Sequence, residues 1–112
     1  MPTNTVASRR VCFTMRIKPE RIEDYLAVHS AVWPEMLDAL RETGWSDYSL
    51  FVDRQEGLVV GYLETDDFDA ALAAMNTREV NTRWQAGMAE FFVDEVAPDT
   101  TMTRLAEYFH LD

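Results

Sequence analysis

Residues 45–64 read WSDYSLFVDRQEGLVVGYLE, and this stretch decides the fold. Its two ends, residues 45–53 and 58–64, are rich in aromatic and β-branched side chains, which favour the extended backbone of a strand. Residues 54–57 between them have the length of a hairpin loop and end in glycine. The stretch therefore predicts a β-hairpin.

A further strand and an interrupted helix precede this hairpin. Apolar residues alternate over residues 11–18, VCFTMRIK, which indicates a strand with one buried face. From residue 22 to residue 40 apolar side chains recur at steps of three and four, the spacing of one helical face. Pro34 cannot donate the backbone hydrogen bond to Ser30, so we expect two helical pieces on either side of residues 31–34.

Two helices and a last strand follow the hairpin. The run DAALAAM at residues 69–75 predicts a short helix, which Asp66 or Asp67 can cap. Residues 77–94 continue at helical steps, and residues 101–111 alternate weakly, as in a strand. The resulting order predicts an α+β fold of the ferredoxin-like βαββαβ type, in which both helical regions cover one face of a four-stranded antiparallel sheet.

The length of 112 residues suits one domain, which we place at residues 10–112. The polar, aperiodic residues 1–9 are expected to form a flexible tail. The sheet face opposite the helices would then carry several apolar side chains, from the set Cys12, Thr14, Trp45, Phe51, Leu58, Val60 and Tyr62. Because water disfavours such a face, we predict a homodimer joined through its sheets.

Charge and cysteine content exclude several classes of function. Twenty acidic and ten basic residues give a net charge of −10, which repels nucleic-acid phosphates and anionic lipids but has little effect on a neutral sugar. One cysteine and two histidines argue against a disulfide framework and against a metal site. No apolar run approaches the length of a membrane span or of a signal-peptide core. We expect a soluble cytoplasmic protein without nucleic-acid, membrane or metal partners.

His29 is the candidate for chemistry, because it is the only histidine within a periodic segment. It follows Tyr25 by one helical turn on the inward face. An inward histidine is often structural, with buried partners for its ring nitrogens. The alternative is a general acid or base, because imidazole titrates near neutral pH. The helix break at Pro34 favours the second interpretation, since it frees backbone polar groups and opens space nearby.

Two further aromatic residues are candidates for binding. Tyr48 is either an interior aromatic residue or the hydrogen-bonding wall of a polar pocket. Trp84 is either a core residue or the plane on which a pyranose rests, with Arg83 and Gln85 beside it for the hydroxyl groups. No glycine-rich phosphate loop, nucleophile elbow or dinucleotide fingerprint occurs in the sequence.

The segment YLAVHSAVWPEM at residues 25–36 resembles the Y-x-x-x-H-x-x-[IV]-W-P-E-[LM] stretch of L-rhamnose mutarotases. The similarity continues in DYSLF at residues 47–51 and in Arg83-Trp84 followed by Met88, and it extends over about residues 10–109. It implies a dimeric α+β barrel that interconverts the α and β anomers of L-rhamnopyranose. Because this reaction requires only proton transfer, no cofactor is expected.

The resemblance also assigns roles to single residues. The histidine of the family motif, the proton donor, corresponds to His29. The tyrosine four residues earlier corresponds to Tyr25 and the strand tyrosine to Tyr48, both as sugar contacts. The aromatic pair on the second helix begins at Trp84, whereas Gln85 stands where many members have another tryptophan. We expect His29 to be catalytic. The residues expected to bind the sugar are Tyr25, Tyr48, Trp84 and Gln85.

Two alternatives remain open. A cofactor-independent monooxygenase of the same small barrel type could also place a histidine and a tryptophan in its pocket, and fold alone does not separate the two. A non-catalytic ligand-binding dimer would leave His29 structural, and a pocket without a polar wall opposite His29 would favour it. The Trp-Pro-Glu sequence that follows His29 favours the mutarotase.

Overall fold

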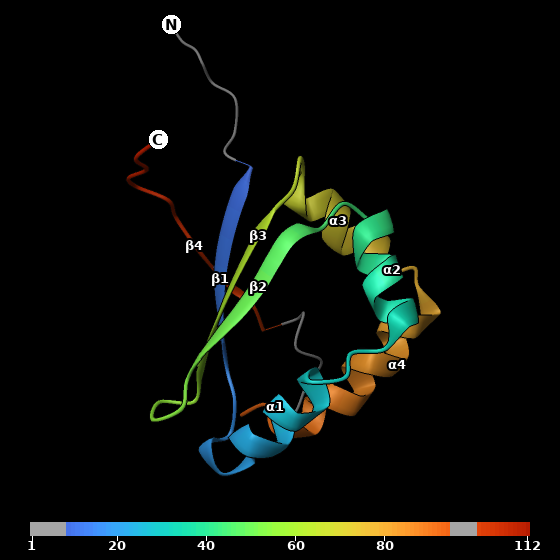
Figure 1. The fold of residues 1–112 in the computed structure, drawn as a ribbon, viewed down its shortest axis with the longest axis vertical. Helices are drawn as coiled ribbons and strands as arrows, with labels where there is room; N and C mark the ends of the chain where they lie inside the picture. The colour runs from blue at the N-terminus through green and yellow to red at the C-terminus, as the bar shows by residue number, and fades with distance from the viewer. Residues whose placement is uncertain (1–8, 95–100) are drawn as a thin grey trace, which may run out of the picture.

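A computed structural model describes residues 9–94 and 101–112 as an antiparallel sheet with its helices against one face (Figure 1). The strands are β1 (Arg10–Arg16), β2 (Ser46–Asp53), β3 (Leu58–Glu64) and β4 (Thr103–Leu105), in the spatial order β2-β3-β1-β4. The helices are α1 (Ile22–His29), α2 (Pro34–Glu42), α3 (Phe68–Met75) and α4 (Glu79–Met88), with short 3-10 helices η1 (Pro19–Arg21) and η2 (Ala89–Phe91). The predicted α+β ferredoxin-like fold is confirmed.

The predicted hairpin forms half of the sheet. β2 pairs antiparallel with β3 up to Asp53, which lies opposite Leu58. β1 occupies the other side of β3 and places Phe13 opposite Gly61. Phe13 has no exposed surface and stacks on the ring of Phe68 from α3. The core therefore lies between this strand pair and the helices.

Trp45 differs from its predicted position on the uncovered face of the sheet. A register shift between Ser46 and Ser49 interrupts the pairing of β2 with β3, and Asp47 within it has a φ of 49°. Such an irregularity shifts the alternation of side chains, so that residues before it change face. Trp45 is consequently only 7% exposed and contacts Tyr48 and Phe68 in the core.

The predicted break in the first helix is confirmed. α1 ends at His29, and α2 begins at Pro34, which occupies its first turn. The fixed φ of proline suits this position, and its missing N–H group would have no helical partner there. The predicted cap of α3 is also present, because the Asp67 carboxylate accepts a hydrogen bond of 3.0 Å from the Ala70 amide.

The second helical region is shorter than the predicted residues 77–94. α4 ends at Met88, and the chain after η2 pairs with the end of β1 instead of continuing the helix. The Lys18 amide donates to the Phe91 carbonyl at 2.9 Å, and the Val93 amide donates to the Arg16 carbonyl at 3.2 Å. These strand-type hydrogen bonds require extended backbone and therefore end the helix.

The last strand is also shorter than predicted. β4 covers Thr103–Leu105, and its pairing with β1 extends only from Cys12 to Thr14. Residues 106–112 are exposed and follow without regular structure. They lead away from the sheet in Figure 1.

The predicted tail lies mostly outside the described residues, which begin at Arg9. The carbonyl of Arg9 accepts a hydrogen bond from the Thr65 amide at 2.9 Å. Within residues 9–94 and 101–112, no helix has the length and apolar character needed to cross a membrane.

The close contact between Gly61 and Phe13 can be tested by adding one methyl group. A Cβ at position 61 would overlap the buried ring of Phe13. We expect Gly61→Ala to lower the free energy of unfolding by about 1–3 kcal/mol, measured by urea denaturation. The matched control is Gly87→Ala in α4, where a Cβ meets no atom within 4 Å. Helical propensity should make this control about 0.5–1 kcal/mol more stable. Equal stability of both variants would contradict the packing.

Candidate active site

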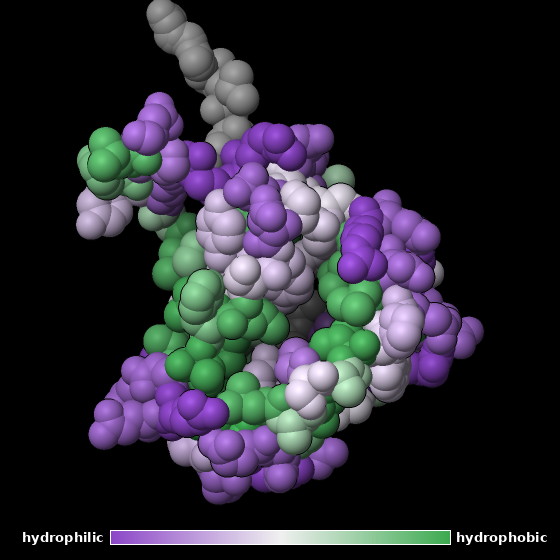
Figure 2. All heavy atoms as spheres, in the orientation of Figure 1, coloured by the Kyte–Doolittle hydropathy of each residue, from purple (hydrophilic) through white to green (hydrophobic). Residues whose placement is uncertain are grey.

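A cavity of about 370 Å³ lies between the helical layer and the sheet. In Figure 2, apolar residues gather around the hollow that separates the sheet from the helices. Most side chains that line the cavity are apolar, and its uncharged polar groups include those of His29, Tyr48, Asn81 and Gln85. An apolar cavity with a few polar groups is typical of a site for a small molecule.

His29 lies at the C-terminal end of α1, where the chain breaks before Pro34. Its Nδ1 lies 3.0 Å from the carbonyl oxygen of Tyr25, one turn earlier in the same helix. A carbonyl oxygen only accepts hydrogen bonds, so Nδ1 carries the proton and donates it. Nε2 makes no hydrogen bond to another residue in the described parts of the chain. This nitrogen is therefore available to a molecule in the cavity.

Burial also determines the charge of His29. Removal from water lowers the pKa of His29 below its ordinary value of 6.5, and the hydrogen bond to the Tyr25 carbonyl opposes this effect only in part. At neutral pH the imidazole is therefore mainly uncharged. In that form Nε2 has a free electron pair and can accept a proton.

Trp84 forms an aromatic wall beside His29. It belongs to the inward face of α4, with Val80, Asn81 and Met88, and is buried. Its ring stands nearly perpendicular to the imidazole, with 5.4 Å between the ring centroids. Trp33 packs edge-on against Trp84 at 5.0 Å and remains partly exposed. The structure thus brings Trp84 to His29, while its contact with a ligand stays a prediction.

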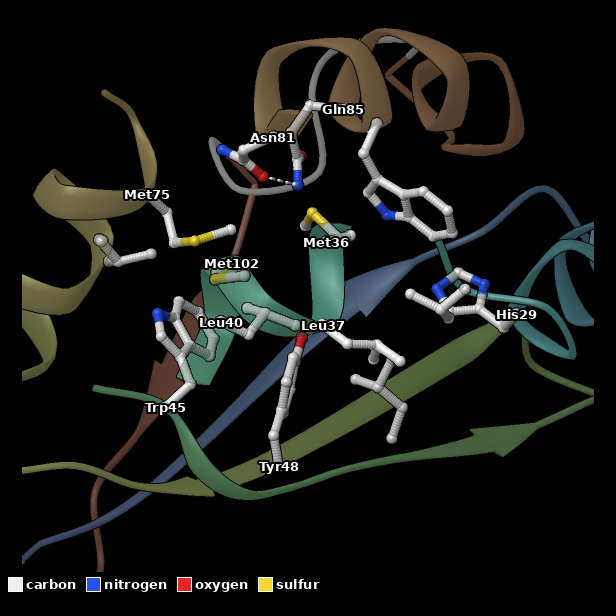
Figure 3. A pocket seen from close by; sticks show the side chains of 14 residues that line it. His29, Met36, Leu37, Leu40, Trp45, Tyr48, Met75, Asn81, Gln85 and Met102 are labelled. Carbon is white, nitrogen blue, oxygen red and sulfur yellow. Dashed lines mark hydrogen bonds between the residues drawn. The ribbon is translucent and has the colours of Figure 1, made fainter. Parts of the chain in front are cut away.

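The two predicted tyrosines occupy different positions. Tyr48 rises from β2 and lines the cavity, and Figure 3 shows its hydroxyl group pointing toward the helices. Burial raises the pKa of Tyr48, so its hydroxyl stays protonated and can donate a hydrogen bond. Tyr25 is 4% exposed and is absent from the residues that line the cavity. It packs behind His29, with 4.3 Å between the ring centroids.

Gln85 lines the cavity together with a residue that the sequence analysis missed. Asn81 lies one helical turn before Gln85 and accepts a hydrogen bond from its Nε2 at 3.2 Å (Figure 3). Asn81 is only 4% exposed. The sequence signal that could have indicated Asn81 was its helical spacing, which places it on the same face as Trp84 and Met88.

Among residues 9–94 and 101–112, none that lines the cavity carries a carboxylate or a thiol. In the described part of the chain, no three His, Cys, Asp or Glu side chains lie close enough together to hold a metal ion. The groups that are present can hold an uncharged polar molecule against aromatic and aliphatic surfaces. They can also transfer a proton to and from it through His29.

Comparisons with known proteins agree on one family. Residues 10–111 match the family model described as L-rhamnose mutarotase. A protein of Sinorhizobium fredii named L-rhamnose mutarotase is 33% identical over 102 residues, which cover 91% of this chain and 97% of the relative. One of Oceanobacillus iheyensis with the same name is 30% identical over 104 residues, 93% of this chain and 99% of the relative.

Two solved structures share the fold. The crystal structure of an L-rhamnose mutarotase from Formosa agariphila superposes with a TM-score of 0.75 at 24% identity, covering 94% of this chain and all of that chain. The crystal structure of an antibiotic biosynthesis monooxygenase superposes with a TM-score of 0.58 at 23% identity, covering 88% of this chain and 97% of that chain. At these identities both similarities establish the fold alone.

The lowered pKa of His29 can be measured by NMR. The variant His110→Asn retains one histidine, so the imidazole resonances need no further assignment. Titration should give a midpoint below 6.5, because burial disfavours the imidazolium. Because the unfolded chain then binds the proton more readily than the folded chain, the free energy of unfolding should fall as the pH drops below 6.5. A midpoint above 6.5 would contradict a neutral His29.

Proposed function

The chain belongs to the L-rhamnose mutarotase family, and from this premise we propose that it interconverts the α and β anomers of L-rhamnopyranose by proton transfer at His29. In this role the protein is an isomerase. The proposed reaction needs no cofactor, because ring opening and closure leave the oxidation state of the sugar unchanged. The net charge of −10 suits an uncharged substrate.

The observation that carries the proposal is the state of His29. Its Nδ1 is bonded to the Tyr25 carbonyl, so only Nε2 can exchange a proton with a ligand in the cavity. Because burial lowers the pKa of His29, the resting imidazole is a base. A structural histidine with buried partners for both ring nitrogens would leave neither nitrogen to a ligand.

The proposed reaction begins when Nε2 takes the proton of the anomeric hydroxyl. The bond between C1 and the ring oxygen then breaks as the C1 carbonyl forms, and the imidazolium donates its proton to the ring oxygen. Rotation about the C1–C2 bond exposes the other face of the aldehyde. The same steps in reverse close the ring to the other anomer. His29 thus acts as base and then as the donor that the resemblance implies.

The neighbouring residues have distinct proposed roles. The protonated hydroxyl of Tyr48 donates a hydrogen bond to the sugar, and Trp84 supports an apolar face of the ring. Tyr25 acts as a positioning residue. Its carbonyl fixes the tautomer of His29, and its ring packs against the imidazole.

The alternatives receive less support. A polar wall formed by Tyr48, Asn81 and Gln85 lines the same cavity as His29, which argues against a purely structural histidine. The similarity to an antibiotic biosynthesis monooxygenase concerns the fold alone.

We further propose that two copies associate through the uncovered faces of their sheets, in the cytoplasm. Phe51 is 61% exposed and Leu105 is 49% exposed on this face. Half-buried Cys12, Val60 and Tyr62 lie between them in the register of the sheet. A second sheet would remove these side chains from water.

Loss of the imidazole tests the proposed function. We expect His29→Ala to reduce the protein-dependent exchange between the anomeric protons of L-rhamnose by about 10²–10⁴-fold, as removal of a general acid-base group does. Exchange NMR measures the rate, and circular dichroism shows whether the fold is retained. His110→Asn is the control, with the wild-type rate. Unchanged exchange in a folded His29→Ala variant would refute the role of His29, and absence of acceleration by the wild type would refute the function.

A charge on the outer sheet face tests the proposed dimer. We expect Phe51→Asp to convert the protein into monomers, because two copies would bury like charges against each other. Light scattering after size-exclusion chromatography gives the mass. Ala73→Asp adds the same charge at an exposed position of α3 and should leave the dimer intact. A dimeric Phe51→Asp variant would rule out this interface.

A further inference from the structure

The side-chain amide of Asn81 is buried in the cavity wall, and its donor group has no partner among the described residues. The Asn81 oxygen accepts the hydrogen bond from Gln85 Nε2 at 3.2 Å. Its amide nitrogen, a donor of two hydrogen bonds, bonds to no other residue in the described parts of the chain. Asn81 is buried, with a relative exposure of only 4%. A buried donor without an acceptor is unfavourable, so the position suits a ligand that supplies one.

Asn81 lies in the part of the cavity away from His29. The Tyr25 ring contacts Phe91 and Phe92, so α1 lies beside the C-terminal end of α4. Asn81 precedes Trp84 by three residues in α4 and is therefore about 4.5 Å farther from that end. In Figure 3, His29 and Met75 are on opposite sides of the cavity, and Asn81 and Gln85 lie between them on α4.

The geometry of a pyranose ring relates these two places. His29 acts on C1 and the ring oxygen in the proposed reaction. The atoms that face C1 and the ring oxygen across the six-membered ring are C4 and C3. A sugar with its anomeric centre at His29 therefore directs the hydroxyl groups on C3 and C4 toward the far part of the cavity.

We propose that the Asn81–Gln85 amide pair determines sugar specificity by binding the hydroxyl groups on C3 and C4 of the pyranose. Asn81 Nδ2 donates to a hydroxyl oxygen, and the hydrogen bond from Gln85 holds the Asn81 amide in the orientation that presents this donor. The inference rests on the proposed function for the placement of the anomeric centre. It assigns a substrate feature, the configuration at C3 and C4, to two residues that take no part in proton transfer.

The first experiment separates binding from chemistry. Asn81→Leu keeps the size of the side chain and removes both polar groups. We expect the KM for L-rhamnose to rise about three- to tenfold, the effect of one neutral hydrogen bond, with kcat changed less than twofold. Gln85→Met, at a half-buried position, should raise KM in the same direction because it leaves the Asn81 amide unoriented. Thr82→Ala, on the exposed side of the same helix, is the control and should match the wild type.

The second experiment identifies the hydroxyl groups. The wild type should discriminate between L-rhamnose and its C4 epimer, 6-deoxy-L-talose, and Asn81→Leu should reduce this ratio of kcat/KM about three- to tenfold. Discrimination against 6-deoxy-L-glucose, the C2 epimer, should not change in the variant. The C2 epimer is the matched control because it differs from L-rhamnose beside the anomeric centre.

The outcomes separate this inference from the proposed function. If the wild type accelerates the exchange of L-rhamnose while Asn81→Leu and Gln85→Met leave KM and the C4 ratio unchanged, the amide pair is structural and the inference is wrong. An equal reduction in the discrimination against the C4 epimer and against the C2 epimer would also overturn it. If no sugar is turned over, ligand-observed NMR with L-rhamnose still tests the pair. In that case binding weakened by Asn81→Leu supports the inference, and unaltered or absent binding refutes it.

Discussion

The proline at position 34 imposes the constraint on which the site depends. Proline has no N–H group to donate to the Ser30 carbonyl, and its ring crowds that carbonyl, so it kinks or breaks a helix. Here α1 ends at His29 before α2 begins at Pro34. The imidazole at the end of α1 bonds back to the carbonyl of Tyr25, one turn earlier. One ring nitrogen is thus held by the helix and the other is left for the cavity. Nearby, Trp33 precedes Pro34 and packs on Trp84, which links the break to the aromatic wall.

The cavity combines a neutral imidazole with a lining that, among the described residues, carries no charged side chain. Burial lowers the pKa of His29 and raises that of Tyr48, so both groups are neutral near pH 7, and in the proposed reaction they act as acceptor and donor. A neutral polar ligand loses little by leaving water for such a site, provided that its hydroxyl groups find partners. None of the carboxylates in the described part of this acidic chain lines the cavity. In the described part of the chain, the hydrogen-bonding groups at the cavity are therefore uncharged, as the proposed neutral substrate requires.

Much of the site could be predicted from local sequence. The spacing of Tyr25, His29 and Pro34 indicated a histidine at a helix break. Tyr48 and Trp84 were candidates for binding from their sequence setting, and the resemblance then assigned both to the sugar. The position of Tyr25 behind His29 could not be derived in this way. Residues four apart share a helical face, but only the packing of α1 against Phe91 and Phe92 determines which one reaches the cavity. Asn81 was missed because a single polar residue on a helical face does not by itself indicate a ligand, although its spacing placed it on the face of Trp84 and Met88.

The sequence by itself determined the order of strands and helices, the break at Pro34 and the hairpin, because these follow from periodicity and from the backbone chemistry of proline and glycine. Only the tertiary structure decided where these elements end and which face some residues occupy. The irregularity around Asp47 reversed the face of Trp45, and hydrogen bonds to Arg16 and Lys18 ended the second helical region early. Such outcomes depend on partners distant in the chain, which local periodicity does not contain. The same holds for the amide pair of Asn81 and Gln85, whose place beside the cavity exists only once α4 packs over the sheet.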